Sequence, residues 1–156
     1  MNQTSVLDLS TDESTLVLST WYSASPERVF GAWLDPEAMK KWIKPSPECV
    51  LEILRFEAQV GGEFAVRMIL DEGTFGYSGR FHAIDPHHYI EMSWQWDPSD
   101  EDPYPETLLT IELQAQNGGT QLVLTHKRLR SLESRDAHSE GWTNTLTTLF
   151  TYLETQ

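Results

Sequence analysis

The sequence predicts a single α+β domain in which a curved antiparallel sheet is covered by one long C-terminal helix. Two observations support this prediction: apolar residues alternate with period two from residue 49 to residue 127, and the period becomes helical after residue 134. The 156 residues match the usual size of one domain. No repeat, linker or low-complexity tract divides the chain. We therefore expect one domain over residues 1–156, with residues 1–13 as a flexible arm.

The N-terminal third predicts one strand followed by two short helices. Residues 16–21 alternate in the manner of a strand. Ser25-Pro26-Glu27 then supplies a capping serine and a first-turn proline, and Asp35-Pro36-Glu37 repeats this start signal. The second helix should end before Pro45 and Pro47, because proline lacks the amide hydrogen that an interior turn requires.

The central part of the chain predicts consecutive antiparallel strands. Alternation and turn residues bound four of them, at residues 49–58, 63–70, 75–84 and 89–97. Two more, at residues 107–114 and 120–127, flank Asn117-Gly118-Gly119, which is a strong hairpin signal. The sheet should therefore contain six or seven strands. Residues 97–106 are rich in proline and acidic side chains, and we expect a mobile loop there.

The C-terminal segment predicts an amphipathic helix over residues 134–154. Its apolar residues recur at intervals of three and four, as expected for one helical face: Trp142, Leu146, Leu149, Phe150 and Leu153. Polar residues fill the opposite face. This stripe should pack against the sheet.

Composition limits the classes of partner. The chain carries 11 Lys and Arg against 24 Asp and Glu, a net charge of -13 that repels nucleic acid and anionic lipid surfaces. It contains neither an export signal nor an apolar run of the roughly 20 residues that span a bilayer, so we expect a cytoplasmic location. Cys49 is the only cysteine, which excludes an internal disulfide and a structural zinc site. We expect no metal, nucleotide or other cofactor.

Several motifs, taken in order, resemble the family named after the activator of heat-shock protein 90 ATPase. The segments that carry the resemblance are residues 25–33, 35–37, 61–64, 79–86, 119–126 and 141–149. The resemblance implies the helix-grip, START-like fold of the SRPBCC superfamily, in which the sheet wraps the terminal helix and often leaves an apolar cavity. Trp42-Ile43 departs from the paired aromatics of many relatives and should alter the cavity wall.

The resemblance does not imply one activity, because relatives with this fold include lipid carriers, hormone receptors, aromatic-ring cyclases and co-chaperones. The leading hypothesis is a binding protein that holds a small apolar or amphipathic molecule between sheet and helix. The first alternative is a stress-response protein that contacts a heat-shock chaperone and stimulates its ATPase. The second is a cyclase or hydrolase in which His126 acts with an acid such as Glu112.

Strand alternation and the helical stripe point six side chains toward the expected cavity: Phe64, Tyr77, Trp94, His126, Trp142 and Leu146. Tyr77 and His126 would orient a guest through polar contacts. Each of these residues could instead be ordinary core, and His126 is more simply a buried histidine that hydrogen-bonds a neighbour.

Other polar residues favour surface interpretations. Arg67 could anchor an anion in the cavity, but a solvated arginine on the sheet is the simpler interpretation. His82, His87, His88 and His138 lack metal-ligand spacing and are expected on the surface. The acidic residues 97–102 fit a solvated loop better than a docking surface.

Overall fold

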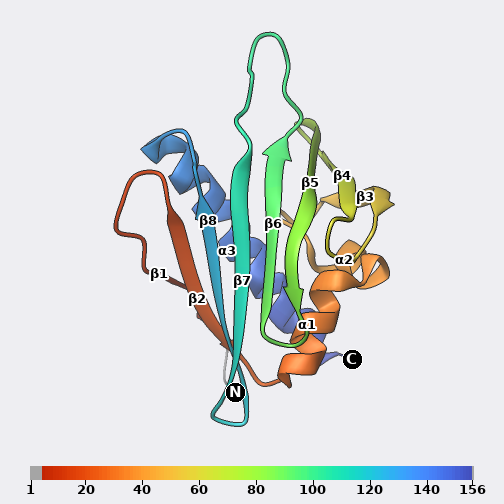
Figure 1. The fold of residues 1–156 in the computed structure, drawn as a ribbon, viewed down its shortest axis with the longest axis vertical. Helices are drawn as coiled ribbons and strands as arrows, with labels where there is room; N and C mark the ends of the chain where they lie inside the picture. Colours follow the sequence, from red (N-terminus) through yellow and green to blue (C-terminus); the bar gives the residue numbers. More distant parts are fainter. Residues whose placement is uncertain (1–4, 156) are drawn as a thin grey trace.

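The computed structural model describes residues 5–155 and is built around one antiparallel sheet (Figure 1). The strands are β1 Leu7–Asp8, β2 Leu16–Tyr22, β3 Val50–Phe56, β4 Glu63–Leu70, β5 Gly73–Asp85, β6 Tyr89–Trp96, β7 Thr107–Gln116 and β8 Gly119–Lys127. The helices are α1 Pro26–Leu34, α2 Pro36–Trp42 and α3 Leu132–Glu154. The strand order is β1-β2-β8-β7-β6-β5-β4-β3. Strands β3 to β8 form a simple meander. β2 pairs with β8, and β1 pairs with β2 at the edge of the sheet.

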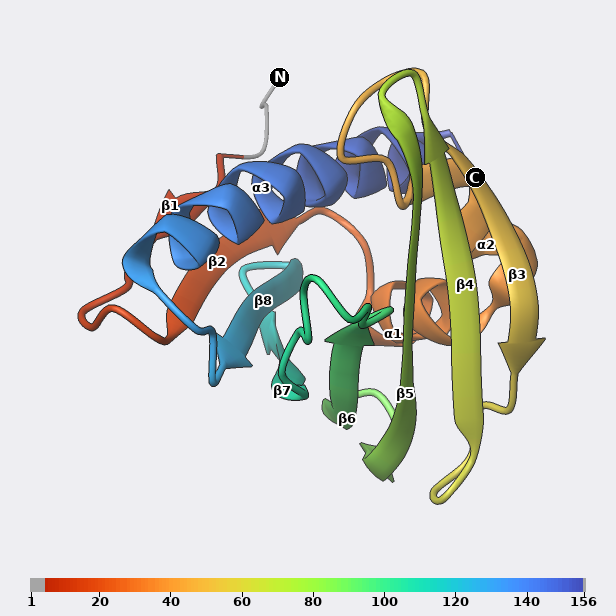
Figure 2. The same cartoon turned by 90° about the horizontal axis from the view of Figure 1, so that it is seen from above.

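The sheet curves, and α3 lies across its concave face (Figure 2). Side chains from β2 and β8 meet α3 there, and Leu18, Leu124 and Leu149 are fully buried. Burying one such leucine stabilises the fold by roughly 1.5 to 3 kcal/mol. The predicted stripe is confirmed for Trp142, Leu146, Leu149 and Leu153, which are all buried. This is the helix-grip arrangement that the resemblance implies.

The two short helices begin at the predicted caps. The Ser25 hydroxyl accepts a hydrogen bond from the Arg28 amide, and the Asp35 carboxylate accepts one from the Glu37 amide. Each bond satisfies an amide that the first helical turn leaves without a partner. α1 packs against β7 and β8, whereas α2 packs against β3 and α3. The two helices therefore connect the interior strands β7 and β8 and the edge strand β3 to the terminal helix.

The N-terminal segment differs from the prediction. Residues 1–4 lie outside the described residues, but Leu7–Asp8 form β1, which pairs with β2. The Ser139 hydroxyl donates to the Asp8 carboxylate at 2.8 Å, so α3 also holds this segment. The expected flexible arm is thus wrong for residues 7–8, and the sheet has eight strands, which is more than the six or seven expected.

The start of α3 also differs slightly from the prediction. The helix begins at Leu132, two residues earlier than expected, because the Ser131 hydroxyl caps it by accepting from the Ser134 amide at 3.0 Å.

Candidate functional site

A cavity of about 570 Å³ lies between α3 and the inner face of β4, β5 and β6. The α3 backbone lies closer to β2 and α2 than to the middle strands. The α3 residues that line the cavity fall between Glu133 and Thr145. Ile43 and Pro45, which follow α2, complete one wall. Of the pair Trp42-Ile43, expected to alter this wall, Ile43 lines the cavity, whereas Trp42 is fully buried outside the lining. The volume falls within the range of about 300 to 1,000 Å³ that small-molecule sites occupy.

The closed end of the cavity is aromatic. Tyr77, Trp94 and Trp142 line it and are 5%, 4% and 8% exposed. The Tyr77 and Trp94 rings stack with centroids 4.5 Å apart, and Trp96 meets Trp94 edge-on at 4.7 Å. Such pairs gain roughly 0.5 to 1.5 kcal/mol beyond area burial and hold the rings in fixed orientations. The wall is therefore both apolar and rigid.

Three of the six side chains expected at the cavity lie outside its lining. Phe64 packs behind Tyr77 with ring centroids 6.3 Å apart, and His126 lies behind Trp94 at 5.1 Å. Leu146 is fully buried where α3 packs closely against the core. Alternation identified the inner face of the sheet correctly, but it does not reveal where along that face the helix leaves space.

His126 is fully buried and uses both ring nitrogens. The Trp142 indole donates to His126 Nδ1 at 3.2 Å, and His126 Nε2 lies 2.7 Å from the Thr107 hydroxyl oxygen. That hydroxyl donates to the Trp94 carbonyl, so Nε2 must carry the hydrogen. The imidazole is thus neutral. Burial, and then the proximity of His138, holds the pKa of His126 well below 6.5.

His138 lines the cavity, so its expected surface position is wrong. Its Nδ1 donates to the Ser134 carbonyl at 2.8 Å, and its Nε2 accepts from the Trp96 indole at 3.0 Å. Both nitrogens are used by the neutral ring, and burial lowers the pKa of His138. The sequence did contain a signal, because His138 precedes Trp142 by one helical turn and shares its face.

These bonds argue against the suggested catalytic pair. Glu112 is exposed and pairs in register with Val123, on the opposite face of the sheet from His126. Since both His126 nitrogens are already bonded, the ring has no free lone pair with which to accept a substrate proton. The described residues near His126 therefore form a structural network.

The mouth of the cavity carries charge and is partly covered by residues 97–106. Arg130 binds both carboxylate oxygens of Asp102, and its guanidinium lies 4.2 Å from the centre of the Tyr104 ring. This arginine lowers the pKa of the Asp102 carboxyl. The Gln95 amide also donates to the Tyr104 carbonyl at 2.7 Å. The segment has no helix or strand, as expected, but these contacts anchor it beside the cavity.

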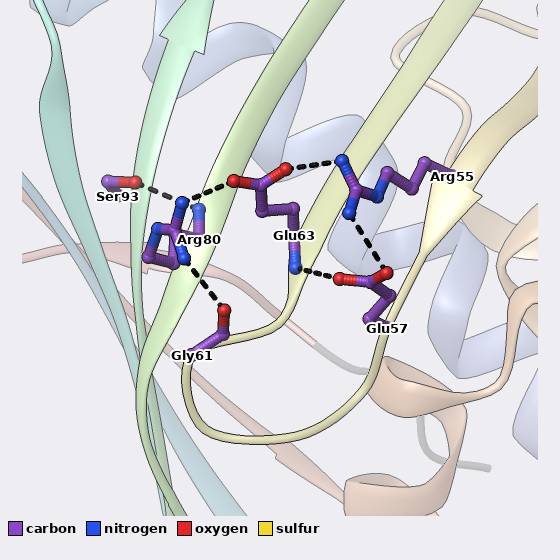
Figure 3. Close-up of polar contacts among 6 residues, drawn as sticks. All are labelled: Arg55, Glu57, Gly61, Glu63, Arg80 and Ser93. Atoms are coloured by element: carbon purple, nitrogen blue, oxygen red, sulfur yellow. Dashed lines mark hydrogen bonds and ion pairs between the residues drawn. The ribbon is translucent and has the colours of Figure 1, made fainter.

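A charged cluster surrounds the β3–β4 turn (Figure 3), and none of its residues lines the cavity. Glu63 joins Arg55 to Arg80, and Arg55 also pairs with Glu57 at 3.0 Å. Arg80 donates to the Gly61 carbonyl at 2.9 Å, which ties the β3–β4 turn to β5. Two arginines and two glutamates neutralise one another. The cluster therefore stabilises a turn and offers no net charge to a ligand.

The remaining polar candidates lie on the surface. Arg67 pairs with Glu52 at 3.3 Å, and both side chains are 48% exposed, which confirms the solvated interpretation. His82 lies 3.3 Å from Glu91. Nowhere in residues 5–155 do three or more His, Cys, Asp or Glu side chains gather so that they could hold a metal ion. Among the same residues, no helix has the length and apolar character needed to cross a membrane.

Solved structures share this architecture. A protein from Chromobacterium violaceum is 27% identical, with a TM-score of 0.82 over 90% of this chain and 97% of its own. A protein from Silicibacter pomeroyi, described as AHSA1, is 26% identical, with a TM-score of 0.74 over 91% of this chain and 99% of its own. No curated protein sequence matches the chain. The model of the family "Activator of Hsp90 ATPase homolog 1-like protein" matches residues 23–154, and the chain therefore belongs to that family.

Proposed function

We propose that the protein binds a small apolar or amphipathic molecule in the cavity between α3 and the middle strands. The observation that carries this proposal is the aromatic closed end, where Tyr77, Trp94 and Trp142 border about 570 Å³ of space. Side chains around an empty space lose dispersion contacts on one side, and an apolar guest restores them. The proposal retains the cytoplasmic location expected from the sequence and requires no cofactor.

Two helical glycines provide a matched test. Gly141 lines the cavity, and a Cβ atom built there would lie 3.6 Å from Pro45, at an ordinary contact distance. Gly31 in α1 is exposed, and a Cβ built there meets nothing within 4 Å. Gly141→Leu should fill the cavity, whereas Gly31→Leu should leave it open. Both substitutions replace a helical glycine with a better helix former, so neither should lose the fold through helix propensity.

The assay is titration with an environment-sensitive hydrophobic dye, accompanied by thermal unfolding of each variant. The unchanged protein and Gly31→Leu should bind one equivalent of dye, and Gly141→Leu should bind at least about tenfold more weakly. A protein that binds no dye, or equal binding by the two variants, would refute the proposal.

A second candidate function is stimulation of a heat-shock protein 90 ATPase, which the family description names. Its specific support is the edge strand β3, where Val50 and Leu54 are 58% and 51% exposed. Exposed apolar side chains on a sheet edge are suited to contact another protein. Purified chaperone should then hydrolyse ATP faster with this protein than without it. Leu54→Ser should reduce the stimulation, whereas the control Leu132→Ser on α3 should not. If the chaperone hydrolyses ATP equally fast with and without this protein, the function is excluded.

A further inference from the structure

Two hydroxyl groups at the closed end of the cavity make no hydrogen bond within the described part of the chain. Tyr77 and Thr145 both line the cavity and are 5% and 2% exposed. Among the same residues, three side-chain polar atoms lack a partner and are also completely inaccessible to solvent: Trp33 Nε1, Ser46 Oγ and Arg135 Nε. The Tyr77 and Thr145 oxygens lack a partner but are not completely inaccessible. Both oxygens therefore touch the open space of the cavity.

Neighbouring hydroxyl groups on and beside α3 do have partners. On α3, Thr147 and Thr148 donate to the carbonyls one turn earlier, at 2.8 and 3.0 Å. The buried Tyr22 hydroxyl donates to the Leu146 carbonyl at 2.8 Å. Buried hydroxyls nearly always have a partner, because an unpaired one loses its hydration without compensation. The missing partner of Tyr77 and Thr145 must therefore come from whatever fills the cavity.

The closed end also lacks charge. The ionised lining residues Asp97, Arg130 and Glu133 are all exposed at the mouth. His138 is neutral in its observed bonds, and burial raises the pKa of Tyr77, which keeps its hydroxyl protonated. A carboxylate or ammonium group at this end would be desolvated without a counter-ion, at a high cost in free energy.

We infer that the guest carries an uncharged oxygen, a hydroxyl or a carbonyl, which hydrogen-bonds Tyr77 and Thr145 at the closed end while its apolar body contacts the aromatic wall. This inference rests on the proposed function and specifies its ligand class. A guest carbonyl oxygen can accept from either hydroxyl, and a guest hydroxyl can accept from or donate to either.

Three small probes of nearly equal size test the inference by calorimetric titration near neutral pH. They are 2-naphthol, naphthalene and 2-naphthoate, which offer a neutral oxygen, no polar group and a carboxylate. The unchanged protein should bind 2-naphthol about tenfold more tightly than naphthalene, since one or two added hydrogen bonds correspond to that ratio. It should bind 2-naphthoate more weakly than 2-naphthol.

Two nearly isosteric variants remove the hydroxyls one at a time. Tyr77→Phe and Thr145→Val should each weaken 2-naphthol binding about three- to tenfold and leave naphthalene binding unchanged. Thr147→Val, on the exposed side of the same helix, is the matched control and should bind all three probes as the unchanged protein does. Because each cavity variant deletes an unpaired oxygen, its melting temperature should not fall; a hydroxyl bonded within the protein would give the opposite result.

The outcomes separate the inference from the proposed function. Equal affinity for 2-naphthol and naphthalene, or variants that weaken both equally, would overturn the inference and leave the proposed function intact. Failure of all three probes to bind would overturn both.

Discussion

Mild acid should destabilise the protein through His126. Its neutral ring accepts from Trp142 at Nδ1 and donates to Thr107 at Nε2. Protonation would place a hydrogen on Nδ1, so the Trp142 indole would lose its acceptor. It would also bury a positive charge beside His138, the titratable group that faces this ring, with centroids 5.0 Å apart. Burial and the neighbouring His138 therefore lower the pKa of His126 well below 6.5.

The sign and size of the effect follow from proton linkage. An unfolded chain takes up the His126 proton near pH 6.5, and the folded protein does not. Stability is therefore complete above about pH 6.5 and is lost as the pH falls below it. While the folded-state pKa stays below the working pH, each pH unit costs about 1.4 kcal/mol. If the ring stays neutral in the folded protein down to pH 5, the loss from pH 6.5 is about 2 kcal/mol, and His138 adds to it because its pKa is also lowered.

Urea unfolding followed by tryptophan fluorescence measures this loss. In His126→Gln the amide oxygen can accept from Trp142 and the amide nitrogen can donate to Thr107, but the side chain does not titrate. In this variant the free energy of unfolding should fall less steeply between pH 6.5 and pH 5, by about the 1.4 kcal/mol per pH unit that one titrating group contributes. His88→Gln, whose side chain is 70% exposed, should keep the full slope. Stability that stays flat down to pH 5, or an unchanged slope in His126→Gln, would refute the neutral assignment.

Three further outcomes are expected. Gly79→Ala should destabilise the fold by about 1 to 3 kcal/mol or more, because its Cβ would lie 1.9 Å from a β6 carbonyl oxygen. Gly31→Ala should stabilise the fold by about 0.5 to 1 kcal/mol, because alanine is the better helix former and its Cβ meets nothing within 4 Å. Urea unfolding measures both changes. Leu149→Ala should cost about 2 to 5 kcal/mol, and an unchanged melting temperature would contradict its core position. Arg130→Gln should speed amide hydrogen exchange in residues 97–106 with little change in melting temperature, and equal exchange rates would show that the Asp102 pair does not anchor them.

Most of the fold could be predicted because its elements carry local signals. Caps at Ser25 and Asp35 fix the short helices, and the spacing from Trp142 to Leu153 fixes the buried face of α3. The strand Leu7–Asp8 could not be predicted in this way. Two residues are too few to show a period, and their conformation depends on pairing with β2.

The site was predictable only in part. Periodicity assigned Tyr77 and Trp94 to the inner face of the sheet, but it assigned Phe64 and His126 to the same face and could not tell which of the four line the cavity. What separates the two pairs is the distance between helix and sheet, which no local pattern contains. Thr145 was missed for a related reason. Its position three residues after Trp142 marks it as inward-facing, but the lack of a hydrogen-bond partner emerges only in three dimensions.

The two ends of helix α3 differ in how they meet the core. In its C-terminal half, Leu149 and Leu153 are buried, and the Arg28 guanidinium donates to the Leu153 carbonyl at 2.6 Å, so this half fastens the helix to the core. Closer to the N-terminus of the helix, Gly141 and Thr145 line the cavity. Substitutions of Gly141 or Thr145 remove few packed contacts, whereas Trp142 on the same part of the helix is buried and bonded to His126. Under the proposed function, Gly141 and Thr145 are therefore the positions at which a substitution changes the guest while Leu149 and Leu153 preserve the fold.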